Sequence, residues 1–208
     1  MTELLDEYQP GHGMDHETMF ACIQEGFPWH DPERSHPQIR TADEWWADLL
    51  PALFRGYCRA GIAKALAHDL ASRVRQRYLR SDRYRLDPAA PDSLQTVAAA
   101  GWANAVLSNH VPELDRILDQ LGLLDLIDTV FTSARTGYEK PNPEAFRLPF
   151  RAMGAPAGVW MVGDSPSADV LGAEATGIPA ILVHGRPNAA PRSVPDLRAA
   201  ARIILDSD

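Results

Sequence analysis

The stretch that decides the fold is VWMVGDSPSADVLGAEATG, which occupies residues 159–177. It opens with a short apolar run of the length of a buried strand. Gly163 then allows a tight turn, Asp164 stands where the strand ends, and Pro166 can begin a helix. A second apolar run, 178–183, follows the glycine that ends this helix. The stretch therefore predicts a strand–loop–helix–strand unit, the building block of a parallel α/β sheet.

Two carboxylates lie close together in this unit. Asp164 follows the strand, and Asp169 falls in the first turn of the helix. In an open parallel sheet, ligands bind at the carboxyl ends of the strands. Carboxylate oxygens at that position suit a hard cation such as Mg²⁺. The alternative interpretation is that Asp164 only caps the helix, as many aspartates do.

The alternation of strands and helices continues through the second half of the chain. Further strands are predicted at 102–107, 129–132 and 203–205, and further helices at 93–100, 111–121 and 143–153. This order of elements predicts an α/β fold for residues 91–208, with a doubly wound, Rossmann-like parallel sheet.

The first part of the chain has a different pattern. Residues 14–90 are predicted to be helical, with no convincing strand. Thr41 and Glu44 form a capping box at the start of the clearest helix, which carries a broad apolar stripe. We assign Trp45 and Trp46 in that stripe to packing rather than to a substrate platform.

Composition limits the classes of partner. The 208-residue chain has a net charge of −8 at pH 7 and a pI near 5.3, which argues against nucleic acid as the main partner. No stretch has the apolar length of a transmembrane helix, and the N-terminus lacks a signal-peptide core, so no membrane partner is expected. Cys22 and Cys58 are predicted to be free thiols. These features predict a cytoplasmic protein, either monomer or homodimer.

Polar residues also follow the other two strands of the predicted sheet. Ser108 and Asn109 come after the strand at 102–107, where a hydroxyl and turn amides can cradle a phosphate oxygen. Lys140 comes after the next strand and, as a compact cation, can neutralise phosphate charge. Taken singly, Ser108 is explained as a helix cap and Lys140 as a solvated charge. Their joint occurrence at strand ends favours a phosphate site.

Three segments resemble successive motifs of the haloacid dehalogenase-like hydrolase superfamily. AVLSNHVPEL (105–114) resembles its second motif, GYEKPNPEAF (137–146) its third, and MVGDSPSADVLGA (161–173) its fourth. The helical residues 14–90 are similar in placement to the family's inserted helical cap. The Gly-Asp-Ser form of the last motif favours phosphatase members over dehalogenases.

The resemblance implies a role for each site residue. Ser108 is the phosphate-binding hydroxyl, assisted by amides at Asn109, and Lys140 is the lysine that holds and neutralises the phosphoryl group. Asp164 is the magnesium ligand, and Asp169 supports the metal shell. The implied activity is Mg²⁺-dependent hydrolysis of a small phosphorylated metabolite beneath a cap that closes over the site.

One motif of the family has no counterpart. The family's first motif is a strand ending in Asp-x-Asp-x-Thr, whose first Asp attacks phosphorus to form an aspartyl-phosphate and whose second is general acid and base. The nearest approaches lie around Asp6 and Asp15, and neither follows an apolar strand. We assign both to the cap and its linker. The chain as it stands is therefore expected to be inactive or nearly so.

The missing strand also matters for stability. In the family this strand lies in the middle of the sheet, and burying about five apolar side chains contributes roughly 8–15 kcal/mol. That rivals the net stability of a whole domain, about 5–15 kcal/mol, and its loss leaves two strand edges unpaired. We expect that Met1 lies just downstream of the first motif, that residues 1–13 are a remnant of the core leading to the cap, and that the last helix is clipped.

Two other functions and one assembly remain open. A relative that has lost its nucleophile would bind phosphate or a partner without turnover, and a 2-haloacid dehalogenase would need no metal. The apolar cap helices could also form an interface between copies of the chain.

Overall fold

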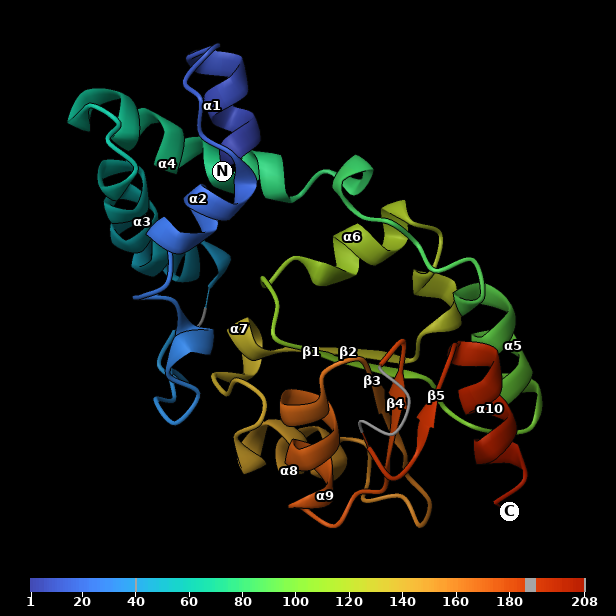
Figure 1. Cartoon of the computed structure of the whole chain (residues 1–208). Helices are drawn as coiled ribbons and strands as arrows, with labels where there is room; N and C mark the ends of the chain where they lie inside the picture. The colour runs from blue at the N-terminus through green and yellow to red at the C-terminus, as the bar shows by residue number, and fades with distance from the viewer. Residues whose placement is uncertain (40, 186–189, 208) are drawn as a thin grey trace.

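The computed structural model describes residues 1–39, 41–185 and 190–207. The chain forms a helical part followed by an α/β part (Figure 1). The helical part comprises α1 (Thr2–Tyr8), α2 (His16–Cys22), η1 (Pro28–His30), α3 (Ala42–Arg59), α4 (Lys64–Tyr78) and η2 (Ser81–Arg83). The α/β part comprises α5 (Ala90–Ala99), β1 (Ala105–Ser108), α6 (Leu114–Gln120), η3 (Leu124–Leu126), β2 (Thr129–Thr132), α7 (Ser133–Thr136), α8 (Pro143–Ala152), β3 (Met161–Gly163), the π-helix η4 (Pro166–Leu171), α9 (Gly172–Glu174), β4 (Ala180–Val183), β5 (Ser193–Val194) and α10 (Leu197–Leu205).

Helix α3 begins with the predicted capping box. The Thr41 side chain accepts a hydrogen bond from the Glu44 backbone N–H, and the Glu44 carboxylate accepts one from the Thr41 backbone N–H. The helix continues through Pro51. Trp45 is 3% exposed and lies in the main hydrophobic cluster, which confirms that it packs in the core.

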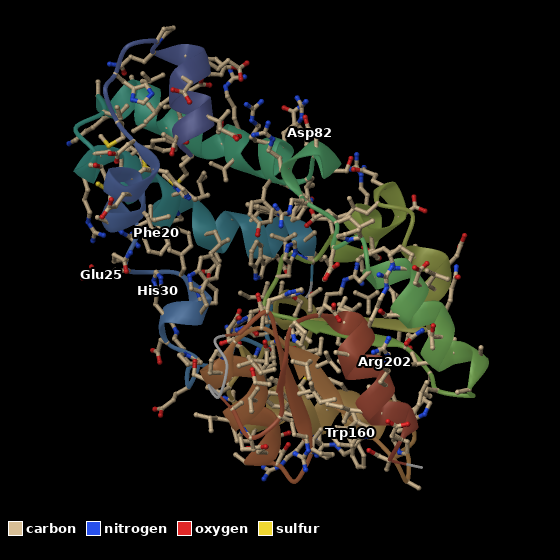
Figure 2. The ribbon with its side chains drawn as sticks, turned by 45° about the vertical axis from the view of Figure 1, so that its right-hand side comes forward. Phe20, Glu25, His30, Asp82, Trp160 and Arg202 are labelled. Atoms are coloured by element: carbon tan, nitrogen blue, oxygen red, sulfur yellow. The ribbon has the colours of Figure 1, made fainter. Side chains whose placement is uncertain are left out.

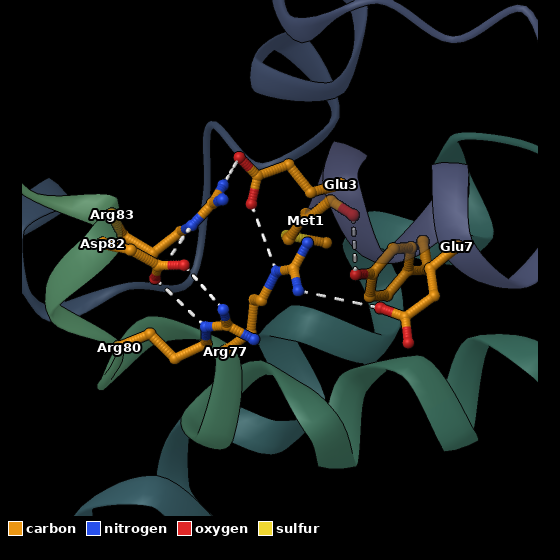
Figure 3. Close-up of polar contacts among 8 residues, drawn as sticks. Met1, Glu3, Glu7, Arg77, Arg80, Asp82 and Arg83 are labelled. Atoms are coloured by element: carbon orange, nitrogen blue, oxygen red, sulfur yellow. Dashed lines mark hydrogen bonds and ion pairs between the residues drawn. The ribbon is translucent and has the colours of Figure 1, made fainter.

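Residues at the start of the chain form a helix that packs on the helical part. Leu4 and Leu5 of α1 are buried in the same cluster as α3 and α4, and the Tyr57 hydroxyl donates to the Met1 carbonyl oxygen over 3.1 Å. Glu3 forms ion pairs with Arg77 and Arg83 across this contact (Figure 3). Exposed ion pairs contribute little to stability, so burial of the two leucines is the main attachment of α1.

Strand β4 shows why the α/β part is doubly wound. Leu182 packs in one cluster with Phe146 of α8, whereas Ile181 and Val183 pack in another with Ile204 of α10. Because side chains alternate along a strand, β4 is covered by helices on both faces. The parallel α/β fold is therefore confirmed.

The hydrogen-bonded sheet is in two pieces. Strand β1 pairs in parallel with β2, and β3, β4 and β5 form a second parallel sheet. All four β4 residues are buried, whereas β3 is half-buried throughout and β1 is half-buried to exposed. In the part of the chain that the structure describes, β1 and β3 each have one neighbouring strand. This arrangement agrees with the expectation of two unpaired strand edges.

Two details of the predicted elements are wrong. The apolar run 203–205 is not a strand but the end of α10, whose first turn is capped by Asp196. The helix predicted at 111–121 begins only at Leu114, after a turn that contains Pro112. The short strand β5 was not predicted, because a two-residue strand carries no periodic signal.

The sequence predicted free cysteines and no membrane-spanning helix. Cys22 and Cys58 are free, as predicted. Within the described ranges, no helix combines the length and apolarity needed to cross a lipid bilayer.

The unequal burial of β3 and β4 predicts unequal costs for the same substitution. Val183 of β4 is 4% exposed, so Val183→Ala should lower the free energy of unfolding by about 2 kcal/mol, from two buried methyl groups and a residual cavity. Val162 of β3 is half-buried, and Val162→Ala should cost less than about 1 kcal/mol. Urea unfolding of both variants measures the difference. Equal losses would contradict the exposed edge of β3.

Candidate active site

The carboxyl ends of the strands face the helical part. Trp160 directly precedes β3, and Figure 2 places it at the end of the α/β part that is remote from the helical part, where Phe20 is labelled. Strand β3 therefore ends on the side nearer the helices, and Lys140 Nζ, which bonds to both Leu107 and Asp169, places the end of β1 close to the end of β3. The residues predicted for the site follow these strands, so the topology brings them to one edge of the α/β part.

Lys140 joins the two sheets at this edge. Its Nζ donates to Asp169 Oδ1 over 2.6 Å and to the backbone oxygen of Leu107 over 2.9 Å. Leu107 belongs to β1, and Asp169 lies in η4, directly after β3. The Lys140 and Asp169 side chains are 10% and 6% exposed. The lysine thus makes a buried ion pair and also satisfies a carbonyl oxygen of β1.

Asn109 fixes the backbone of Lys140. Its Oδ1 accepts from the Lys140 N–H over 2.7 Å, and its Nδ2 donates to the Lys140 carbonyl over 2.9 Å. The sequence predicted Asn109 as a phosphate-binding residue. Its side-chain amide is instead committed to Lys140, so its backbone N–H is the group left to meet a phosphate oxygen.

Gly163 has a different purpose from the predicted one. Its φ is not among the positive values recorded for the glycines of the described residues, and a Cβ at this position would collide with the Asp169 carboxylate. Asp169 Oδ2 accepts from the Ser165 N–H over 2.9 Å. The glycine therefore makes room for the Asp169 side chain to lie across the end of β3.

Asp164 and Ser108 are the site residues left without a recorded side-chain partner among the described residues. Asp164 is exposed, and Ser108 is half-buried. Magnesium is commonly held in proteins by one or two carboxylates with water and phosphate oxygens completing its shell. The free carboxylate of Asp164 fits such a site. Asp169 is already bonded to Lys140 and Ser165, and no cluster of three or more metal-ligating side chains occurs in the described ranges.

The two nearest approaches to the missing motif lie away from this edge. Asp15 caps α2 by accepting from the Thr18 N–H, and this hydrogen bond lowers the pKa of the Asp15 carboxyl. Asp6 lies on α1 and contacts His12 at 3.0 Å. Neither aspartate follows a strand, and both lie in the helical part.

Comparison with known proteins identifies the family. A family model described as haloacid dehalogenase-like hydrolase matches residues 16–177. The chain belongs to the haloacid dehalogenase-like hydrolase family.

The curated relatives of this chain include phosphatases. The chain is 35% identical to the phosphoserine phosphatase of Thermus thermophilus over 168 residues, 79% of this chain and 66% of that protein. It is 36% identical to the ribulose-1,5-bisphosphate 5-phosphatase of Halopiger xanaduensis over 176 residues, 83% of this chain and 70% of that protein. The chain spans just under two thirds of the Thermus protein.

Solved structures show the fold. The crystal structure of 2-haloacid dehalogenase from Pseudomonas syringae pv. Tomato DC3000 superposes with a TM-score of 0.68 at 22% sequence identity, and the match covers 100% of this chain and 88% of that one. At this identity the likeness establishes a haloacid dehalogenase-like fold and nothing about substrate.

The sequence patterns did not predict an aromatic cluster that lies beside the site. The His110 ring lies 5.5 Å from the Tyr78 ring and 5.9 Å from the Tyr84 ring, measured between centroids. Glu113, three residues on, accepts from Trp46 Nε1 and from Arg75. Both groups link the helical part of the hydrolase to the segment after β1. The available signal was the position of His110 directly after Ser108 and Asn109.

The environment of His110 predicts a pH dependence of stability. Burial lowers the pKa of His110 from its usual value of 6.5, so the unfolded chain binds this proton more readily than the folded chain. The free energy of unfolding should therefore fall as pH is lowered below about 6.5. His110→Phe keeps an aromatic ring and should lose less stability between pH 8 and pH 5 than the wild type does. His110→Gln should behave likewise. Parallel pH profiles for wild type and both variants would contradict this.

Proposed function

We propose that this hydrolase is a phosphatase acting on a small phosphorylated metabolite. The observation that carries the proposal is the position of Lys140 Nζ, buried against Asp169 at the ends of β1 and β3. A fixed cation beside the Ser108 hydroxyl and the free Asp164 carboxylate suits a phosphoryl group with a divalent cation. The phosphatases among the relatives support the same class of substrate.

Each residue has a part in binding. Lys140 holds a phosphoryl oxygen and offsets its charge, while the Ser108 hydroxyl donates to a second oxygen. Asp164 is the ligand for Mg²⁺, which when bound supplies charge neutralisation and orients the phosphoryl group. Asp169 holds the lysine in place.

The chemical step needs a further carboxylate. The family places its nucleophilic aspartate at the end of a central strand, which would lie between β1 and β3. The described residues form no strand there and so provide no such aspartate at this edge. We therefore propose that the 208-residue chain binds phosphate with Mg²⁺ but turns over phosphate esters very slowly or not at all.

A second candidate is a binding protein without catalysis. The observation that favours it is the same lack of an attacking carboxylate beside an intact Lys140–Asp169 pair. Both candidates predict phosphate binding with little or no turnover by the 208-residue chain, and measurable metal-dependent turnover would favour the phosphatase.

The test combines phosphate binding with ester hydrolysis. Calorimetry with inorganic phosphate, with and without Mg²⁺, should show metal-dependent binding by the wild type. Asp164→Asn should abolish the effect of Mg²⁺, because the amide oxygen is neutral and a weak ligand for a hard cation. Asp125→Asn changes an exposed aspartate of η3 and should leave binding unchanged. Hydrolysis of an aryl phosphate by the same samples measures turnover.

The outcomes separate the alternatives. Phosphate binding that ignores Mg²⁺ and survives Asp164→Asn would contradict the proposed site. Metal-dependent turnover that Asp164→Asn abolishes would show that another carboxylate attacks, and Asp6 and Asp15 are then the next variants. Release of halide from a 2-halo acid in excess chelator would instead identify a dehalogenase.

A further inference from the structure

Glu139 and His36 form a buried pair that the proposed mechanism does not use. Glu139 is 1% exposed, and its Oε1 lies 3.7 Å from His36 Nε2, within reach of an ion pair but beyond a hydrogen bond. Among the described residues, neither carboxylate oxygen and neither ring nitrogen has a hydrogen-bond partner. Glu139 directly precedes Lys140, so the pair is attached through the backbone to the lysine of the site.

The segment 32–37, which enters the helical part before α3, is docked on the segment 137–142 around this pair. The His36 N–H donates to the Gly137 carbonyl over 2.8 Å, and Asn142 Nδ2 donates to the Pro32 carbonyl over 3.0 Å. Hydrogen bonds thus tie both ends of the lysine segment, 137–142, to segment 32–37.

Gly137 allows this close contact. Its φ is +82°, and a Cβ at that position would lie 2.5 Å from Pro37 Cα. A residue with a side chain would be strained in this conformation and would push the segments apart. The contact between the two segments therefore depends on the glycine backbone at position 137 as well as on the buried pair.

His36 is the group that faces the buried Glu139 carboxyl. A buried carboxylate without a hydrogen bond is costly unless a cation compensates it. His36 is the ion-pair partner recorded for Glu139 in the described ranges. Removal of the imidazole would leave the carboxylate uncompensated, and the segment 137–142 would shift to bring it to water. Lys140 would move with it.

We propose that His36 and Glu139 are positioning residues, which hold Lys140 at the ends of β1 and β3. The pair acts through the backbone of the lysine segment, while Asn109 holds the same backbone from the other side. The functional value of this positioning rests on the proposed phosphoryl site, where small displacements of a charged group reduce its effect strongly. The positioning itself is a property of the folded chain.

Amide hydrogen exchange measures the positioning directly. The Lys140 N–H is bonded to Asn109 Oδ1, and the Leu182 N–H, bonded to the Arg192 carbonyl in the second sheet, reports global opening. His36→Ala should speed exchange at Lys140 about 10-fold or more while exchange at Leu182 changes little. Adding Glu139→Gln to His36→Ala should restore most of the protection, because the uncompensated charge is gone. Glu17→Gln, which changes an exposed glutamate on α2, is the matched control.

Calorimetry with inorganic phosphate on the same variants then tests the functional consequence. Affinity should fall with His36→Ala and recover in the double variant. Unchanged exchange at Lys140, equal acceleration at Lys140 and Leu182, or a double variant no better than His36→Ala would each overturn the positioning role. If the exchange pattern holds but the wild type has no affinity for phosphate, positioning stands and the proposed phosphatase site fails.

Discussion

The structure of the site depends on the buried ion pair between Lys140 and Asp169. It stands where the two sheets meet, and removing one partner of such a pair costs about 3–5 kcal/mol because the other charge is left buried. The surrounding residues are arranged around this constraint. Asn109 fixes the lysine backbone, Gly163 leaves room for the aspartate, and the Ser165 N–H takes the second carboxylate oxygen. A charge held in this way needs little reorganisation when an anion arrives.

The Lys140–Asp169 pair also places the two aspartates of the fourth motif in different environments. Because Asp169 is committed to Lys140, it cannot serve as a freely moving ligand, whereas Asp164 is exposed and uncommitted. Asp169 therefore fixes the position of Lys140, whereas Asp164 is the proposed ligand for a metal ion. Sequence spacing alone treats the two aspartates as equivalent metal ligands, since it carries no information about burial.

Local patterns predicted most of the architecture. The capping box at Thr41, the strands that become β2 and β4, and the grouping of Ser108, Lys140 and Asp164 at strand ends all follow from short-range signals. The apolar run 203–205 misled because three apolar residues fit a helix and a strand equally well, and the cap at Asp196 decides for the helix.

The contacts that the sequence did not predict join residues distant in the chain. Lys140 meets Asp169 across 29 positions and Asn109 across 31, and Glu139 meets His36 of the helical part. No periodicity links such positions, so these contacts follow only from the packed topology. For Gly163 the sequence indicated the need for a glycine but gave the wrong reason, because the reason is a side chain from the next helix.

The division of the sheet connects stability with chemistry. The backbone groups along the unpaired edges of β1 and β3 need partners, and Lys140 Nζ supplies one for the Leu107 carbonyl. A strand between β1 and β3 would pair both edges and bury their apolar side chains. A carboxylate at the carboxyl end of that strand would also arrive beside Lys140, Ser108 and Asp164. Among the described residues, the lack of such a strand therefore accounts both for the division of the sheet and for the lack of an attacking carboxylate beside Lys140 in the proposed site.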